Sequence, residues 1–426
     1  MIQEAFIHFV WKHQYFIKSN LATSTGQPLN IIKPGFHNTD AGPDFKEGKV
    51  VIDGLEWNGS IEIHRRSSDW HVHKHSSNES YNNVVLHVVW EHDLDIELRD
   101  GTIIPTFEIA DRVDTELLNG YKALMNSLAP VPCAYQLPYV DDLIKETMIE
   151  RMTVERLYNK AQLVTEVYNE TGNDWEQTAF RWLAKSFGFK VNAEQFEKLA
   201  QLIPSRLIAK NSNNLKRLEA LFFGQAGFLT SKGTTDEYHK ELKEEHKFLS
   251  HKYALPEPML MFQWKFMRLR PANFPSIRIA QLAAIMHNQY GLFSRIKQIQ
   301  SLKHLENLLI AETSDYWRRH YRFGKTTNKN VPVFGTTSVQ SVGINTVAPL
   351  LVSYGISVDQ QMYVDQAVTL LESLAPEINR ITRLWQNLGV KSGAAFTTQG
   401  LIQLYNLYCQ RKKCLDCTIG TRILKR

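Results

Sequence analysis

The segment GPDFKEGKVVIDGLEWNGSIEIHRRSSDWHVHKH, residues 42–75, decides how the first quarter of the chain folds. Two dipeptides within it, Asp53-Gly54 and Asn58-Gly59, are strong signals for β-hairpins. The residues around both dipeptides include alternating apolar side chains, as in half-buried strands. The segment therefore predicts two or three short strands joined by tight turns.

The flanking residues extend this segment into an α/β module. Residues 3–17 have apolar side chains near helical spacing, which predicts a helix. The run NVVLHVVWEHD, residues 83–93, predicts a central strand buried on both faces, and His87 within it should be a hydrogen-bonded core residue. A further strand follows, and Pro105 favours an edge position for it. Residues 1–110 thus predict a helix plus a mixed sheet.

After residue 110 the pattern becomes helical. Long amphipathic runs alternate with breaks rich in Pro, Gly and Ser, and no internal repeat is present. We expect a large, mainly α-helical C-terminal body. The predicted domains are an α/β domain at 1–110, a helical domain at 111–250, and a basic helical domain at 251–426.

The composition is that of a soluble globular chain, with 43% hydrophobic and 22% charged residues among 426. Glu4 stands where a signal peptide has basic residues, and no apolar run reaches the about 20 residues of a membrane span. Four cysteines do not suggest a secreted disulfide scaffold. We therefore expect a cytoplasmic protein with no membrane partner. No feature of the sequence indicates an oligomeric state.

Charge is unevenly distributed. Residues 1–110 contain 15 Asp and Glu against 9 Lys and Arg, together with more than half of the histidines. Residues 264–329 contain 12 Lys and Arg against 3 Asp and Glu. An acidic, histidine-rich module favours metal, and a basic region favours a polyanion such as nucleic acid. Chance clustering on solvated faces would give the same counts.

The acidic residues of the opening segment are candidate metal ligands. Asp44 ends a loop, and Glu62 lies on a strand with His64 two positions later on the same face. Two carboxylates and an imidazole suit Mg²⁺ or Mn²⁺. A turn cap and an ion pair would account for the same acids without any metal. We predict Asp44, Glu62 and His64 as catalytic residues.

Pro43-Asp44 followed by Glu62-Ile63-His64 resembles the motif of the PD-(D/E)XK nuclease superfamily. The resemblance covers about residues 1–110 and implies a restriction-endonuclease-like fold, in which an Asp and a Glu hold the metal and a Lys assists. It also implies that Glu4, on the first helix, adds a ligand. This chain has His64 where the superfamily has Lys, so Arg65 or Lys74 would have to supply the cation.

The whole chain separately resembles a bacterial family known only as domain of unknown function 2851. The stretches that carry the resemblance are GPDF, GSIEIHRRSSDWHVHKH, VVLHVVWEHD, RLRPANFP and the terminal YCQRKKCLDC. This resemblance implies no activity.

The histidines of DWHVHKH, residues 69–75, open a second interpretation. On an extended strand His71, His73 and His75 would share one face, and three imidazoles on one ion form a zinc-hydrolase arrangement. Alternatively, His73 and His75 assist the metal site by binding a phosphate or orienting water. A solvated loop whose histidines have no role is the third possibility.

The cysteines suggest a second metal site. Cys409, Cys414 and Cys417 have the spacing C-x4-C-x2-C, and Cys133 is the fourth cysteine of the chain. Pairs of thiolates spaced C-x2-C bind zinc or an iron–sulfur cluster. We predict such a site, with His or solvent as a fourth ligand if Cys133 is not included. Unrelated buried thiols are the alternative.

Arginines and aromatic residues alternate in WKFMRLRPANFPSIR and YWRRHYRFGK. Cations bind phosphates while aromatic faces stack bases, so these stretches predict a nucleic-acid-binding surface. A core of aromatic residues with arginines reaching out of it would give the same pattern. The predicted binding residues are Arg268, Arg270, Arg278, Arg318, Arg319 and Arg322.

The leading hypothesis is a metal-dependent nuclease or nuclease-like phosphodiesterase, using Mg²⁺ or Mn²⁺ at Glu4, Asp44, Glu62 and His64, with His73 and His75 beside the metal. The second is a nucleic-acid or protein-interaction module without cleavage. The third is a zinc-dependent hydrolase of a small substrate that uses His73, His75 and a carboxylate.

Overall fold

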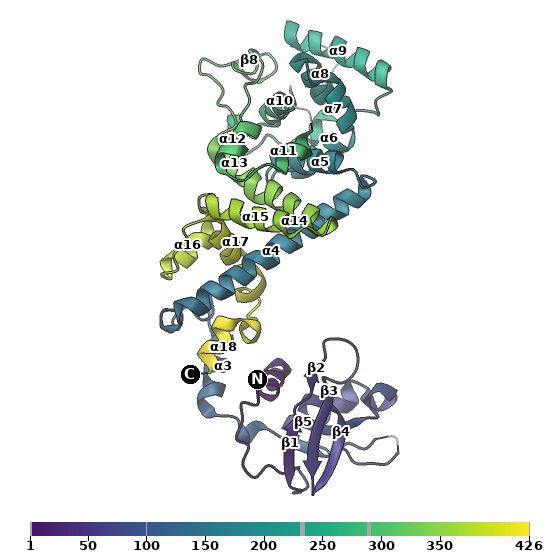
Figure 1. The fold of residues 1–426 in the computed structure, drawn as a ribbon, viewed down its shortest axis with the longest axis vertical. Coiled ribbons are helices and arrows are strands. Elements are labelled where there is room, and N and C mark those ends of the chain that lie inside the picture. The colour runs from purple at the N-terminus through teal and green to yellow at the C-terminus, as the bar shows by residue number, and fades with distance from the viewer. Residues whose placement is uncertain (1, 99, 231–234, 288–290, 426) are drawn as a thin grey trace. The chain divides into compact units, whose positions relative to one another are not determined.

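The computed structural model describes residues 2–98, 100–230, 235–287 and 291–425 (Figure 1). Tertiary contacts divide the chain into two compact units. The first unit combines residues 1–148 with residues 404–426, and the second comprises residues 149–403. The finer division expected at residues 110 and 250 stays a prediction.

The first unit is built on a mixed sheet in the order β1-β3-β4-β5-β6, with β2 also paired to β3 (Figure 1). Its strands are β1 (Leu29–Lys33), β2 (Phe36–His37), β3 (Phe45–Ile52), β4 (Leu55–Arg66), β5 (Val84–Glu91) and β6 (Thr106–Glu108). Its helices are α1 (Glu4–His13), α2 (Asp69–Val72), α3 (Thr115–Asn126) and α18 (Thr418–Leu424), with short helices η1 (His75–Ser77), η2 (Glu79–Tyr81), η3 (Ala110–Arg112), η4 (Leu137–Tyr139), η8 (Leu404–Cys409) and η9 (Cys414–Asp416).

The β3–β4 hairpin forms where the sequence predicted it. Asp53 and Gly54 have φ angles of 50° and 80°, the positive values that a two-residue type I′ turn requires. The second predicted turn, at Asn58-Gly59, is wrong, because β4 runs straight through it. Glycine is needed at 59 for another reason. A Cβ there would lie 2.4 Å from the carbonyl oxygen of Asn83, where the chain enters β5.

The central strand is confirmed: β5 pairs in parallel with both β4 and β6, and β6 forms the edge after Pro105. The two faces of β5 are covered by different helices. Phe6 of α1 contacts Trp90, with ring centroids 6.0 Å apart, whereas Trp70 of α2 contacts His87 at 5.4 Å. Because positions 87 and 90 lie on opposite faces of a strand, the sheet is sandwiched between α1 and α2.

The second unit is almost entirely helical. The long helix α4 (Asp142–Glu170) starts in the first unit and continues into the second. The others are α5 (Trp175–Phe187), α6 (Ala193–Gln201), α7 (Ser205–Asn211), α8 (Leu215–Gln225), α9 (Glu237–Tyr253), η5 (Met261–Gln263), η6 (Pro271–Asn273), α10 (Pro275–Met286), α11 (Leu292–Ile296), α12 (Leu302–Leu309), α13 (Thr336–Val342), η7 (Gly343–Val347), α14 (Ala348–Ser357), α15 (Gln361–Ser373), α16 (Arg380–Asn387) and α17 (Ala395–Gln403), with one small hairpin of β7 (His320–Arg322) and β8 (Lys325–Thr326).

One helical run among the described residues, Thr336–Ser357, is long and apolar enough to cross a membrane by length and composition. Within the protein 72% of its apolar window is buried, and its members Leu350, Leu351 and Val352 belong to the main core of the second unit. Such burial is that of a helix in the core of a folded unit. The predicted architecture, a mixed-sheet module followed by a large helical body, is confirmed, and the restriction-endonuclease-like topology stays a prediction.

Candidate functional site

The carboxylates of Asp44 and Glu62 are held side by side by the pairing of β3 with β4. Phe45 pairs with Ile61, which brings the two acids together where β3 begins. The backbone N–H of Asp44 donates to Oε2 of Glu62 at 3.0 Å, and that of Ile63 donates to Oδ2 of Asp44 at 2.9 Å. Each carboxylate accepts a hydrogen bond from the strand that carries the other, so their relative position is fixed.

Helix α1 adds Glu4 and His8, which are one turn apart. His8 Nε2 lies 3.3 Å from Oδ2 of Asp44 and 3.8 Å from Oε1 of Glu4. Burial raises the pKa of Glu4. Burial lowers the pKa of His8, but the hydrogen bond and the charges of Asp44, Glu4 and Glu62 outweigh it and raise that pKa overall. His8 was not among the residues predicted from the sequence, although a histidine four residues after Glu4 on a helix lies on the same face and could have indicated it.

Three histidine rings meet beside Glu62. His64 Nε2 lies 3.0 Å from Nδ1 of His73 and 3.2 Å from Nε2 of His75. Oε1 of Glu62 lies 3.2 Å from Nε2 of His75 and 3.6 Å from Nε2 of His64. His64 is fully buried and His73 is exposed, so the cluster reaches from the core to the surface.

The segment after β4 brings His73 and His75 back toward His64 by folding into short helices. The extended conformation considered for residues 69–75 is wrong: α2 and η1 replace it, and His71 is exposed, away from the cluster. Trp70 causes this turn, since its ring is fully buried and its Nε1–H donates to Oγ of Ser76 at 3.1 Å. Lys74, with φ of 60°, reverses the chain between the two helices.

His87 is a buried core residue, as expected, and it orients His64 through Nε2, whereas its buried Nδ1 has no hydrogen-bond partner in the described part of the chain. Its Nε2 lies 2.8 Å from Nδ1 of His64, which leaves Nε2 of His64 directed at His73 and His75. Burial and the neighbouring histidines lower the pKa of His64 to about 2. Burial also lowers the pKa of His87, to about 3. Both imidazoles are therefore neutral near pH 7, the state in which an imidazole nitrogen can bind a metal.

The donor atoms fall into two groups, each with three ligand atoms within 4.8 Å of one another: Glu4, His8 and Asp44, and His64, His73 and His75. Glu62 contacts a member of each group. Ligands on one ion at about 2.0–2.2 Å lie about 3 Å apart, which matches the spacing of the histidine nitrogens. The residues thus fit a divalent ion. The ligand group that includes α1 offers mainly oxygen atoms, and the ligand group beside α2 offers nitrogen atoms.

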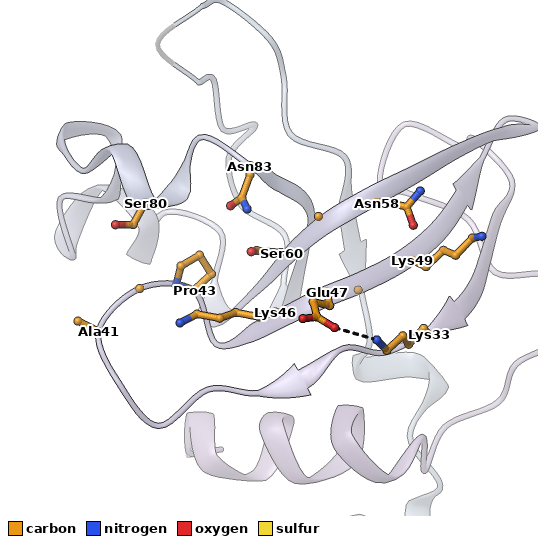
Figure 2. Close-up of a pocket in the computed structure, with 13 residues that line it drawn as sticks. Lys33, Ala41, Pro43, Lys46, Glu47, Lys49, Asn58, Ser60, Ser80 and Asn83 are labelled. Carbon is orange, nitrogen blue, oxygen red and sulfur yellow. Dashed lines mark hydrogen bonds and ion pairs between the residues drawn. The ribbon is translucent and has the colours of Figure 1, made fainter.

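A basic cavity of about 730 Å³ adjoins this cluster and is drawn in Figure 2. Pro43, which precedes Asp44, and Ser60, which precedes Glu62 by two residues on β4, lie in its wall. Three lysines surround it, and Glu47 forms an ion pair with one of them at 3.3 Å. The lysines are Lys33, Lys46 and Lys49, and the other lining residues are polar or small; they include Asn58, Ser80 and Asn83.

The four cysteines all lie in the first unit, three of them in residues 404–426 and Cys133 in residues 1–148. All four are among the described residues, and none forms a disulfide. Cys133, Cys414 and Cys417 are buried.

The six predicted arginines do not share one environment. Arg278 is buried in the second unit, where its guanidinium stacks on Phe189 and Phe334 and donates to Gln281 at 2.9 Å. This burial does not favour the predicted contact with nucleic acid, because the charge faces the core. The aromatic residues beside the arginines pack in or against the core, as in the alternative interpretation. The exposed members are Arg268, Arg270, Arg318, Arg319 and Arg322.

The fold and the site define a two-unit protein whose mixed-sheet module carries a cluster of histidine and carboxylate ligands. The family described as "Protein of unknown function (DUF2851)" has a model that matches residues 4–380. The chain belongs to this family. No curated protein and no solved structure matches it.

Proposed function

We propose that the first unit is a metal-dependent phosphodiesterase that cleaves nucleic acid. The observation that carries the proposal is the convergence of Asp44, Glu62 and Glu4 with His8, His64, His73 and His75 at one end of the β3–β4 pair. The resemblance of Pro43-Asp44 and Glu62-Ile63-His64 to the PD-(D/E)XK motif supports the same class of reaction.

A divalent ion held by these residues would lower the pKa of a water and offset charge that develops on a phosphate. The carboxylates of Asp44, Glu62 and Glu4 suit Mg²⁺ or Mn²⁺, whereas the imidazoles favour Mn²⁺ or Zn²⁺. Among these, Mn²⁺ accepts both ligand types. We therefore expect Mn²⁺ to support cleavage better than Mg²⁺.

The protein's own groups would position the reactants. Burial raises the pKa of Glu62, which makes its carboxylate a stronger base than an exposed Glu and suits it to accept a proton from water. His64, held neutral, cannot supply the cation that Lys provides in the resembled superfamily. The exposed His73 lies where a phosphate oxygen can approach from solvent.

The basic cavity supports a nucleic-acid substrate. Lys33, Lys46 and Lys49 border it, and its wall includes Pro43 and Ser60 (Figure 2). In sequence, Pro43 directly precedes Asp44, and Ser60 lies two residues before Glu62. Three ammonium groups suit several phosphates better than one small uncharged substrate, and a phosphate chain would compete with Glu47 for Lys33, at 3.3 Å, and with Glu56 for Lys49, at 2.8 Å. A strand lying in the cavity would pass close to Asp44.

The test is cleavage of labelled single- and double-stranded DNA and RNA after chelation and readdition of Mn²⁺, Mg²⁺ or Zn²⁺. Asp44→Asn and Glu62→Gln keep an oxygen that can accept the backbone hydrogen bonds, so both variants should fold. Each should lose at least about 100-fold in rate, because transition-state charge is no longer balanced.

Asp53→Asn, in the β3–β4 turn, is the matched control, because asparagine also accepts its positive φ angle. This variant should cleave at the parent rate. Equal cleavage by parent and Asp44→Asn would contradict the proposal. Binding of polynucleotide without cleavage by any metal form would point instead to an interaction module.

The histidine group favours a second candidate, a zinc-dependent hydrolase of a small phosphate ester. Its support is the approach of His64, His73 and His75 nitrogens to within 3.0–3.2 Å. Zinc alone would then restore hydrolysis of a nitrophenyl phosphodiester, and polynucleotide would neither bind nor be cleaved.

A further inference from the structure

The loop of residues 260–270 in the second unit, between α9 and α10, exposes a large amount of apolar surface. Phe262 and Met267 are each 81% exposed, Leu260 is 54% exposed and Met261 is 51% exposed. A single exposed apolar side chain is ordinary in a soluble protein. Several of them close together in sequence form a patch, and such patches mark surfaces that bind a partner.

This loop is anchored to the end of α8 on both sides of its exposed tip. Met259 and Trp264, which flank the tip, are buried. The backbone N–H of Met259 donates to the carbonyl of Gln225 at 2.8 Å. The indole Nε1–H of Trp264 donates to the carbonyl of Ala226, also at 2.8 Å. Because both flanks are fixed, residues 260–262 project into solvent and do not fold back onto the core.

Exposed cations accompany the apolar side chains of the loop. Lys265, Arg268 and Arg270 are all exposed, and they form no ion pair among the residues that the structure describes. No Asp or Glu occurs in residues 258–275. The loop therefore presents apolar side chains and uncompensated positive charge on the same short segment.

The turn between α5 and α6 extends this surface. The side-chain amide of Asn192 donates to the carbonyl of Lys265 and accepts from its backbone N–H, each at 2.9 Å, which holds the turn beside the loop. Phe189 and Val191 of the turn are each 38% exposed, and Lys190 between them is exposed as well. The same combination of apolar and cationic side chains thus occurs on two neighbouring segments.

The chemistry of the exposed side chains favours lipid over other anionic partners. Nucleic-acid bases stack on aromatic rings, but Leu260, Met261 and Met267 have none. The interface of a bilayer takes up aliphatic and aromatic side chains alike, and anionic headgroups attract Lys and Arg. Side chains that are 81% exposed project from the protein, and a fluid bilayer accommodates such a projection without a preformed cavity.

We infer that the loop of residues 260–270, together with the α5–α6 turn, binds the surface of a membrane that contains anionic lipids. Phe262 and Met267 enter the headgroup region, and the cations contact lipid phosphates. The expectation that the protein has no membrane partner rested on spanning segments, which a peripheral contact does not need. The inference does not depend on the proposed nuclease activity.

The experiment is sedimentation of the full-length chain with vesicles of phosphatidylcholine alone or of phosphatidylcholine mixed with phosphatidylglycerol. Binding to the mixed vesicles should be at least about tenfold tighter and should weaken as salt is added, because headgroup charge attracts the cations. Phe262→Ser/Met267→Ser and Arg268→Gln/Arg270→Gln should each lose at least about tenfold in affinity for the mixed vesicles. Both pairs are exposed, so the variants should fold.

Met362→Ser/Ile378→Ser is the matched control, because it removes two apolar side chains that are 62% and 76% exposed elsewhere in the second unit. This variant should bind vesicles like the parent. Phe262→Trp supplies a gain of signal. Vesicles with brominated acyl chains should quench its fluorescence more than that of the parent, since the new indole lies in the bilayer interface. Chelation of divalent metal should leave vesicle binding unchanged, which separates it from cleavage.

A parent protein that stays in solution with the mixed vesicles at low salt would overturn the inference. Equal vesicle binding by the parent and Phe262→Ser/Met267→Ser would do the same. If the parent binds single-stranded polynucleotide but not vesicles, and both loop variants lose that binding, the loop contacts nucleic acid and not lipid.

Discussion

The neighbours of His64 keep its imidazole uncharged near pH 7. His87, His73 and His75 all lie within 3.2 Å of its ring nitrogens, and water does not reach it. A neutral imidazole in this position offers a lone pair and no positive charge.

The buried histidines should make the metal-free first unit sensitive to acid. The pKa values of His64 and His87, about 2 and about 3, lie below their unfolded value of 6.5. A depressed pKa contributes stability that is present above pH 6.5 and is lost as pH falls toward the folded value. The free energy of unfolding of chelator-treated protein should therefore decrease steeply below pH 6.5.

Urea unfolding between pH 5 and 8 checks this expectation. His64→Gln/His87→Gln should give a flatter dependence on pH, whatever its absolute stability, because glutamine does not take up a proton. His71→Gln, at an exposed position, should keep the parent slope. If the double variant keeps the parent slope, His64 and His87 are not the cause of the acid sensitivity.

Only the part of the site that depends on local strand pairing could be predicted from the sequence. Asp44 and Glu62 flank a hairpin, so their approach follows from local pairing. His8 reaches Asp44 only because α1 packs against β4, a tertiary contact that no local pattern encodes. His73 and His75 meet His64 because Trp70 is buried, and the alternating histidines alone favoured a strand instead.

Strand β4 is the element that organises the first unit. Its first half pairs antiparallel with β3 and its second half pairs in parallel with β5. Five consecutive residues, 60–64, are buried, because both faces of the strand are covered. The sequence indicated a turn at Asn58-Gly59, but β4 stays extended there because it pairs with β3 on one side and, from residue 60, with β5 on the other.

Gly59→Ala adds only one methyl group, but it should clearly destabilise the pairing of β4 with β5. The new Cβ would lie 2.4 Å from the carbonyl oxygen of Asn83, just before β5, and 2.5 Å from Cγ1 of the half-buried Val85, and the backbone at the start of a paired strand cannot move freely. We expect a loss of about 1–3 kcal/mol in the free energy of unfolding, measured by denaturant titration. Asn58→Ala, at an exposed neighbour, should change it by less than about 0.5 kcal/mol.

At the scale of the whole molecule, the first unit is discontinuous in sequence. Residues 1–148 and 404–426 share it, and the second unit lies between them in the chain. Neither composition nor periodicity indicated this arrangement, because the helical patterns before and after residue 404 look alike. The mixed sheet and the helical body could be predicted, whereas the return of the last segment could not.

Leu424→Ala should destabilise helix α3, about 300 positions earlier. Leu424 is 4% exposed, and its side chain lies against Gly120 of α3. The cavity should cost about 2–5 kcal/mol and speed amide hydrogen exchange in residues 115–126. Arg422→Ala, at an exposed position on the same helix, should leave that exchange at the parent rate.

The discontinuity also sets an order of events during synthesis. A ribosome delivers the sheet and its ligands first, then 255 residues of helical unit, and only then the segment that packs on α1 and α3. Until that segment emerges, the surfaces it covers are open to chaperones and proteases. A chain that lacks residues 404–426 would therefore be defective in the unit whose larger part was made first.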